Sequence, residues 1–261
     1  MKNSAEQGGS IAFDRAAEYY DRTRGLSPEA VRQVTQLLAG ELRGRALEIG
    51  MGTGRIALPL DAAGAELVGI DLSVPMLMKL RENSGGRAPF PVAVADATLL
   101  PFPDRCFGSA LAAHVFHLIP GWRAAAAELV RVVVPGGVVL VDPGGRGDAD
   151  WEEVPRRFLA ELGTGRVGAA DANDVESAMA ELRLRARELP TIAAHATTSL
   201  GAIIDEYEAG LYSATWSSTP AERTRAATVV RSWARSSLGS LDEQRPIEWA
   251  IRWRAYDVPE A

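Results

Sequence analysis

The sequence lacks the marks of several protein classes. Its 261 residues include a single cysteine, Cys106, which excludes an internal disulfide and is typical of a reducing cytosol. No run approaches the roughly eighteen apolar residues of a membrane span, and residues 1–10 are too polar for a signal peptide. A formal charge of −6 argues against a strongly nucleic-acid-binding surface. We therefore expect a cytoplasmic protein, whose 47% hydrophobic content is ample for a sizeable core.

Three alternating glycines organise the chain. They lie in the stretch 46–60, which reads Ala-Leu-Glu-Ile-Gly-Met-Gly-Thr-Gly-Arg-Ile-Ala-Leu-Pro-Leu. The apolar run before the glycines and the helical apolar pattern after them predict a strand, a tight turn and the start of a helix. Glycine adopts backbone angles that other residues avoid, and its missing Cβ lets a ligand lie on the backbone near a helix N-terminus. The turn is therefore a candidate binding loop.

The spacing of the glycines bears on the ligand. A dinucleotide-binding loop follows the pattern G-x-G-x-x-G, whereas this loop is G-x-G-x-G and is preceded by Glu48. A carboxylate there would repel a pyrophosphate but would suit a ligand that carries an ammonium and a sulfonium charge. The stretch resembles the first motif of the class I S-adenosylmethionine-dependent methyltransferases, an acidic residue followed by G-x-G-x-G. Any other glycine-rich turn is the alternative.

A second carboxylate, Asp71, ends the short apolar run 66–71. In a doubly wound sheet the end of this strand lies at the same edge as the glycine loop. A carboxylate can accept hydrogen bonds from both hydroxyls of a ribose. The alternative is an Asp that caps the next helix, because Ser73-Val74-Pro75 is also a helix start.

Further motifs follow in order and resemble one branch of that family, the ubiquinone/menaquinone-type methyltransferases. The first is F-D-x-x-A-x-x-Y-D-x-x-R in an amphipathic helix expected over 11–24, which in that branch closes over cofactor and substrate. The second is L-P-F-x-D-x-x-F at 100–107. The third is Pro135-Gly136-Gly137, expected as a tight turn before a strand over 138–142. The resemblance covers residues 11–145.

The resemblance implies a cofactor site and an acceptor site. The cofactor would be S-adenosyl-L-methionine, with S-adenosyl-L-homocysteine as product. Its binding residues would be Glu48, Gly50, Met51, Gly52, Gly54, Asp71, Leu72, Met76, Asp96, Ala97 and Ala113. Tyr20 and Arg24 would steer the acceptor, and Trp216, in a polar loop, is a candidate lid or substrate contact. No metal site is predicted.

Two histidines, His114 and His117, lie near the end of the fourth strand, which is expected over 108–116. His117 leaves that strand at a position that is polar at the mouth of the family's pocket, so it is the preferred candidate base; a structural histidine is the alternative. His114 is expected inside the strand.

The pattern as a whole predicts an α/β fold: a doubly wound, seven-stranded, mostly parallel sheet with a helical lid insertion. The expected parts are a disordered tail (1–10), N-terminal cap helices (11–45), the cofactor-binding core (46–145), the lid insertion (146–188) and a completion of the sheet (189–261). Helices are expected over 151–162, 173–188, 200–209 and from 219 to about 238, and the last, antiparallel strand over 247–256.

The predicted function is methyl transfer from S-adenosylmethionine to an oxygen, nitrogen or carbon atom of a small molecule. Two alternatives stay open: a methyltransferase that acts on tRNA or protein, and a protein that binds the cofactor without catalysis. A nicotinamide oxidoreductase is disfavoured by Glu48 and the glycine spacing. We do not expect nucleic acid as a partner, and the sequence does not assign an oligomeric state.

Overall fold

The structure, a computed structural model, describes residues 13–144, 149–164, 168 and 172–260. The predicted disordered tail, 1–10, lies outside the described residues. The chain forms two compact units. The first comprises Met1–Gly144, Val167–Ile192 and Ile251–Ala261, and the second comprises Gly145–Arg166 and Ala193–Ala250.

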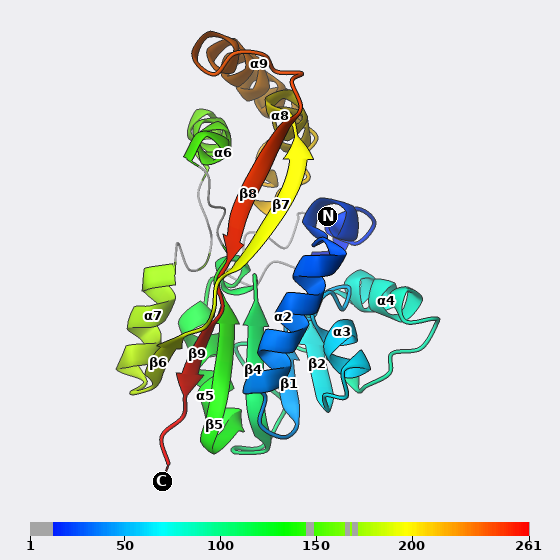
Figure 1. The fold of residues 1–261 in the computed structure, drawn as a ribbon, viewed down its shortest axis with the longest axis vertical. Helices are drawn as coiled ribbons and strands as arrows, with labels where there is room; N and C mark the ends of the chain where they lie inside the picture. Colours follow the sequence, from blue (N-terminus) through cyan, green and yellow to red (C-terminus); the bar gives the residue numbers. More distant parts are fainter. Residues whose placement is uncertain (1–12, 145–148, 165–167, 169–171, 261) are drawn as a thin grey trace. The chain divides into compact units, whose positions relative to one another are not determined.

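The described part of the first unit contains a seven-stranded sheet with the order β3-β2-β1-β4-β5-β9-β6 (Figure 1). Strands β1 to β5 are parallel, and β9 pairs antiparallel with both β5 and β6. This confirms the predicted fold, a seven-stranded, mostly parallel, Rossmann-like sheet. The strands are β1 (Ala46–Ile49), β2 (Leu67–Asp71), β3 (Val92–Val94), β4 (Phe107–Ala113), β5 (Val133–Asp142), β6 (Arg185–Glu188) and β9 (Arg254–Asp257).

Helices pack on both faces of this sheet. On one face α2 contacts α3, and on the other α5 contacts α7 and covers β4 and β5; in Figure 1, α2 crosses in front of the strands and α5 lies behind them. Ser27 caps α2, and Ser73 caps α4 at the helix start that the sequence predicts. The helical elements are η2 (Asp14–Ala16), α1 (Tyr20–Arg24), α2 (Pro28–Glu41), α3 (Ala57–Ala62), α4 (Val74–Asn83), η3 (Phe116–Leu118), α5 (Trp122–Val132) and α7 (Ala172–Glu181).

The central strands are largely apolar because both of their faces are covered. All four residues of β1 are buried, Glu48 included. The face under α5 receives Ala125, Ala126 and Leu129, whose spacing of one, three and four residues places them on one side of the helix. The sheet therefore has little side-chain freedom, and it holds the loops at its edges in fixed positions.

The second unit is helical with a two-stranded sheet. Its elements are α6 (Ala149–Leu162), β7 (Ile192–Thr198), α8 (Leu200–Glu208), η4 (Ser213–Thr215), α9 (Pro220–Ser237) and β8 (Arg245–Ile251), of which β7 and β8 pair. Phe158 of α6 and Ile204 of α8 are buried with Val230 of α9 in one apolar core. Thr219 and Glu222 form a capping box at the start of α9, where the sequence predicts a helix from residue 219.

Two predicted elements are divided in the structure. The helix expected over 11–24 is wrong as one element: among its described residues, η2 and α1 are separate short pieces, and the ring of Phe13 packs edge-on against Tyr20 with centroids 6.1 Å apart. The strand expected over 247–256 is also wrong as one element. Its first part belongs to β8 and pairs with β7, and only β9 completes the seven-stranded sheet.

Two other boundaries differ from expectation. The helix predicted over 173–188 ends at Glu181, because Arg183 adopts a positive φ of 61° and turns the chain into β6. The expected turn at Pro135-Gly136-Gly137 is part of β5, where the pairing with β4 shifts register in a bulge. In the part of the chain that the structure describes, no helix is both long and apolar enough to cross a membrane.

Candidate active site

The edge where β1 and β4 end is the natural binding position of this sheet. The chain runs from β1 outward through β2 to β3 and then returns to the other side of β1 as β4. The connections after β1 and β4 therefore leave in opposite directions and open a crevice at the carboxyl ends of the strands. The glycine loop follows β1, and His114 follows β4.

The glycine loop has the backbone that its sequence predicts. Gly50, Gly52 and Gly54 have φ angles of 61°, 59° and 85°, in a region where residues with a Cβ are strained. A Cβ on Gly50 would lie 2.4 Å from Cγ2 of Val115, the second residue after β4. This close approach joins the loop after β1 to the loop after β4.

The position where Gly52 would carry a side chain is not packed against a neighbouring loop. Among the described residues, a Cβ at this position would meet only the carbonyl oxygen of Gly50, at 3.9 Å, which leaves the space beside it open to a ligand. The side chain of Met51 instead packs against β2, where a Cβ on Gly69 would lie 2.0 Å from its Cε. A ligand could thus lie on the backbone at Gly52, and any contact from Met51 would come from its main chain.

Glu48 is a buried carboxylate in the middle of β1, with 1% of its surface exposed. Its Oε2 atom has no hydrogen-bond partner among the described residues. Burial raises the pKa of this carboxyl from 4.5 to about 8, and the charge of Arg55 opposes the shift only in part. An orphaned acidic oxygen of this kind fits a cationic ligand group, such as an ammonium.

Asp71 ends β2 and is 9% exposed. Its Oδ2 accepts a hydrogen bond from the backbone N–H of Gly52 at 2.7 Å, and its Oδ1 accepts one from Ser73 at 2.8 Å. Burial raises the pKa of this carboxyl despite these N–H donors. The side chain therefore serves the turn before α4 and also binds the glycine loop, while each oxygen keeps capacity for a further donor. The ribose role stays a prediction.

Of the remaining predicted cofactor residues, Leu72, Asp96 and Ala113 end or follow strands of the sheet, and Met76 lies in the first turn of α4. Asp96 follows β3, and its Oδ1 accepts hydrogen bonds from the N–H and the hydroxyl of Thr98, both at 2.9 Å. Ala97, Met76 and Ala113 are buried, and Leu72 is partly buried. Their contacts with the cofactor stay predictions.

A contact that the sequence did not reveal ties α1 to the glycine loop. The carboxylate of Asp21 accepts hydrogen bonds from the hydroxyl of Thr53 and, at 2.9 Å, from the side-chain amide of Asn83 in α4. The same amide donates to the carbonyl of Thr53 at 3.2 Å. The only sequence signal was the Tyr-Asp pair of the N-terminal motif. Tyr20 and Arg24 flank this anchor and are partly buried, and their substrate roles stay predictions.

His114 lies outside the strand in which the sequence placed it. Strand β4 ends at Ala113, and His114 has a φ of 51° and leaves the sheet. Its Nε2 lies 3.0 Å from Oδ2 of Asp142, the last residue of β5. Burial alone would raise the pKa of Asp142, but the charge and hydrogen bond of His114 outweigh it and hold that pKa below its ordinary value. Asp142 was missed, although, like Asp71, it is a carboxylate that ends a buried strand.

The two remaining predicted acceptor residues, His117 and Trp216, belong to different units of the chain. His117 belongs to η3, is partly buried, and its carbonyl accepts a hydrogen bond from the N–H of Gly168 at 3.1 Å. Trp216 belongs to the second unit, and its indole Nε1 donates to the carbonyl of Gly210 at 3.0 Å. The roles of His117 as a base and of Trp216 as a lid or contact stay predictions.

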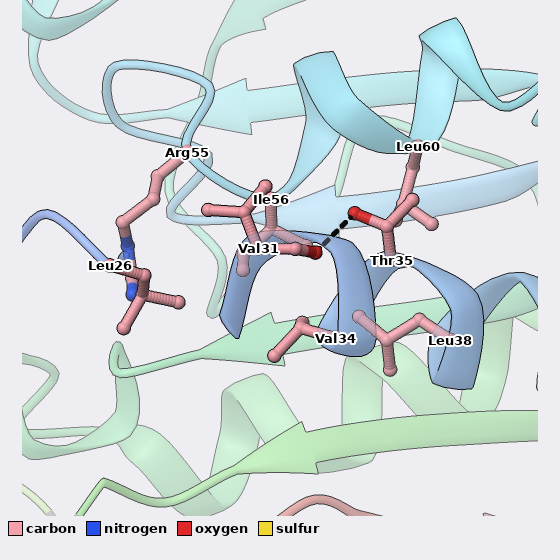
Figure 2. Close-up of a pocket in the computed structure, with 8 residues that line it drawn as sticks. All are labelled: Leu26, Val31, Val34, Thr35, Leu38, Arg55, Ile56 and Leu60. Atoms are coloured by element: carbon pink, nitrogen blue, oxygen red, sulfur yellow. Dashed lines mark hydrogen bonds between the residues drawn. The ribbon is translucent and has the colours of Figure 1, made fainter. Parts of the chain in front are cut away.

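A separate apolar hollow lies between α2 and the start of α3 (Figure 2). The space is too narrow for a water molecule, and the hydroxyl of Thr35 donates a hydrogen bond to the carbonyl of Val31 at 2.8 Å. This hollow therefore offers no acceptor site. It is lined by Leu26, Val31, Val34, Thr35, Leu38, Arg55, Ile56 and Leu60.

Comparison with known proteins agrees with this geometry. Residues 47–141 match the family model described as a methyltransferase domain. A demethylmenaquinone methyltransferase of Thermus thermophilus is 37% identical over 113 residues, 42% of this chain and 51% of that protein. A malonyl-[acyl-carrier protein] O-methyltransferase of Salmonella typhimurium is 32% identical over 139 residues, 53% of this chain and 54% of that protein. The chain thus spans about half the length of these curated relatives.

The fold is also found in solved structures. One, of a protein from Bacillus halodurans assigned to the methyltransferases, aligns with a TM-score of 0.63 at 16% identity and covers 88% of this chain and 98% of its own. The sheet order and the glycine loop thus define a Rossmann-like methyltransferase domain. The match of residues 47–141 and the similarity to these relatives agree with the predicted resemblance to the class I S-adenosylmethionine-dependent methyltransferases of the ubiquinone/menaquinone-type branch. The expected cofactor, S-adenosylmethionine, agrees with these matches, because a Haemonchus contortus N-methyltransferase with this fold, at 17% identity and a TM-score of 0.53, was solved with S-adenosylhomocysteine bound.

Proposed function

We propose that this protein transfers the methyl group of S-adenosylmethionine to a small-molecule acceptor. The observation that carries the proposal is the pairing of an open face at Gly52 with the orphaned, buried carboxylate of Glu48 at the switch point of the sheet. The first would admit the ligand to the backbone, and the second would receive its ammonium. Bound there, the cofactor would supply a methyl group already activated by a sulfonium.

The protein's own task is then to bind, orient and exclude water. Glu48 and the loop at Gly52 would hold the methionine end, and Asp71 would hold the ribose. Asp96 and Ala97 would border the adenine. The anchor from Asp21 to Thr53 supports the idea that the N-terminal segment closes over this site, because it bonds α1 directly to the binding loop.

The small-molecule class is supported by the acidic charge of −6, which disfavours a nucleic-acid substrate. The names of the relatives include an O-methyltransferase and a demethylmenaquinone methyltransferase, and neither substrate is carried over to this chain. A cytoplasmic location fits the single cysteine.

Isothermal titration of the full chain with S-adenosylmethionine, S-adenosylhomocysteine and NAD tests the proposal. We expect affinities in the micromolar range for the first two and none for NAD. The variant Asp242→Asn, which changes an exposed carboxylate of the second unit, is the control and should bind normally. Tight binding of NAD, or no binding of the adenosyl ligands, would contradict the proposed cofactor site. Binding without turnover of any small acceptor would favour a non-catalytic protein.

A further inference from the structure

We propose that His114, oriented by Asp142, is the catalytic base and that the acceptor is a hydroxyl or amine that gives up a proton during transfer. The inference rests on the proposed function and specifies its acceptor class. It is carried by three features around one imidazole ring: the pairing of one nitrogen, the space beside the other and the position of the ring in the fold.

The first feature fixes the tautomer. The carboxylate of Asp142 can only accept hydrogen bonds, so the Nε2 atom 3.0 Å away must carry the hydrogen. In the neutral ring the lone pair then lies on Nδ1, where it can accept a proton. Asp142 is held in turn, because its Oδ1 accepts a hydrogen bond from the N–H of Gly144 at 2.9 Å and its side chain is only 7% exposed.

The second feature keeps Nδ1 accessible. Gly144 has a φ of 77°, and a Cβ at this position would lie 3.1 Å from Nδ1 and 3.2 Å from Cε1 of His114. Any other residue would cover the nitrogen that holds the lone pair. No hydrogen bond or ion pair to Nδ1 is present among the described residues, and the side chain of His114 is 36% exposed. One ring nitrogen is thus fixed and the other is open.

The third feature is the backbone that carries the ring. A positive φ is strained for histidine, at a cost of about 1–2 kcal/mol. The N–H of His114 donates to the carbonyl of Asp142 at 2.9 Å, so the bend is held by the same residue that binds the ring. The next residue, Val115, packs against Gly50. His114 therefore lies between the glycine loop and the end of β5, on the switch-point edge.

The chemistry of this arrangement balances. The lone pair of the acceptor oxygen or nitrogen forms the bond to the methyl carbon, and the carbon–sulfur bonding pair returns to sulfur. The acceptor's hydrogen passes to Nδ1 of His114. The positive charge moves from sulfonium to imidazolium, where the carboxylate of Asp142 stabilises it. Burial opposes ionisation of this carboxyl, but the charge and hydrogen bond of His114, with smaller contributions from the N–H of Gly144 and the charge of Arg55, hold its pKa below the ordinary value.

The test begins with the imidazole rings themselves. The chain has three histidines, so the imidazole signals can be separated by nitrogen NMR of the full-length protein. The signals that disappear in His114→Gln are those of His114. We expect the neutral ring of His114 to be the Nε2–H tautomer, and we expect Asp142→Asn to give a mixture of tautomers. A dominant Nδ1–H tautomer, or a spectrum that Asp142→Asn does not alter, would overturn the orientation.

The second arm measures S-adenosylhomocysteine release from a panel of phenols, alcohols and primary amines. His114→Gln should lower kcat at least about 100-fold while the Kd for S-adenosylmethionine is unchanged. Gly144→Ala should also lower kcat without weakening cofactor binding. The exposed His195→Gln is the matched control and should retain full activity.

The outcomes separate the two proposals. Failure of the wild-type protein to bind S-adenosylmethionine would contradict the proposed function itself. Normal cofactor binding with full kcat in His114→Gln would leave that function standing and overturn the base. Cofactor binding with turnover of none of the panel would contradict the acceptor class.

Discussion

The Oδ2 atom of Asp71 lies 2.7 Å from the backbone nitrogen of Gly52 and accepts its hydrogen bond. The end of β2 and the glycine loop after β1 are thus joined through one carboxylate. The group predicted to bind the ribose also holds the loop predicted to bind the methionine end. Changes at Asp71 should therefore affect both.

Asp71→Asn should weaken the affinity for S-adenosylmethionine by one to two orders of magnitude. The amide replaces one acceptor oxygen with a donor, which either faces the N–H of Gly52 or that of Ser73, and a lost hydrogen bond to a charged group costs about 1.5–3 kcal/mol. Isothermal titration measures the change, with Asp242→Asn as control. Wild-type affinity in Asp71→Asn would remove Asp71 from the cofactor site.

Binding of the cofactor should release a proton from Glu48. Its pKa is raised from 4.5 to about 8 by burial, so it is mostly protonated at pH 7 in the free protein. The ammonium of the ligand would favour the ionised form, and roughly one proton should leave per ligand bound. Titrations in buffers of different ionisation enthalpy measure this release. Glu48→Gln should bind more weakly and release none; release that persists in Glu48→Gln would place the titrating group elsewhere.

The same carboxyl predicts how stability changes with pH. Because its pKa is higher in the folded than in the unfolded chain, Glu48 favours unfolding as pH rises from about 4.5 to about 8. The free energy of unfolding should therefore fall over that range by a few kcal/mol in the free protein. Glu48→Gln should remove this part of the slope in urea denaturation at several pH values. An unchanged slope would contradict the burial of an uncompensated carboxyl.

The anchor between Asp21 and Thr53 should control access to the glycine loop. Asp21→Asn weakens hydrogen bonds to the Thr53 hydroxyl and the Asn83 amide, and the loss should cost about 1–2 kcal/mol locally. Amide hydrogen exchange of residues 19–24 should become faster, and affinity for S-adenosylmethionine should fall several-fold. The neighbouring Arg22→Gln, at an exposed position, should change neither. Faster exchange with unchanged affinity would argue against closure over the cofactor.

Asp257 should stabilise the far edge of the sheet. Its carboxylate accepts hydrogen bonds from Arg187 at 2.7 Å, from Arg185 at 3.2 Å and from Arg43 at 2.9 Å, and these arginines lower its pKa to about 2. The stabilisation should be fully present above the ordinary value of 3.8 and disappear as pH falls through about 2. At pH 7, Asp257→Asn should lower the free energy of unfolding by about 2 kcal/mol. Urea denaturation measures this free energy. The control is Glu181→Gln, which removes an exposed ion pair with Arg123 and should be nearly neutral.

The sequence predicts the sheet and its binding loop because their signals are local. The apolar strand before Gly50 and the carboxylate at the end of the next strand need no knowledge of distant residues. The seven-stranded order and the positive φ angles of the glycines confirm that reading. The helices that the sequence predicts to start at Ser73 and Thr219 do start there, because capping by a hydroxyl is also local.

The elements that the sequence predicts wrongly depend on tertiary contacts. The helix before β6 ends at Glu181, and Arg183 rather than a glycine is the left-handed residue that follows it, so the sequence carries no stop signal there. Apolar and polar residues alternate over 247–256 without a break at Arg252 and Trp253. The division into β8, which pairs with β7, and β9, which pairs with β5 and β6, depends on partner strands elsewhere in the chain. His114 could not be separated from the strand because its bend is held by Asp142, twenty-eight residues later.

The crystal structure of the protein bound to S-adenosylhomocysteine tests the central claim most directly. We predict that the ligand lies on the backbone at Gly52, with its ammonium beside Glu48 and its ribose hydroxyls on the carboxylate of Asp71. A ligand bound away from the crevice between β1 and β4, or one whose ribose and ammonium meet neither carboxylate, would contradict the account.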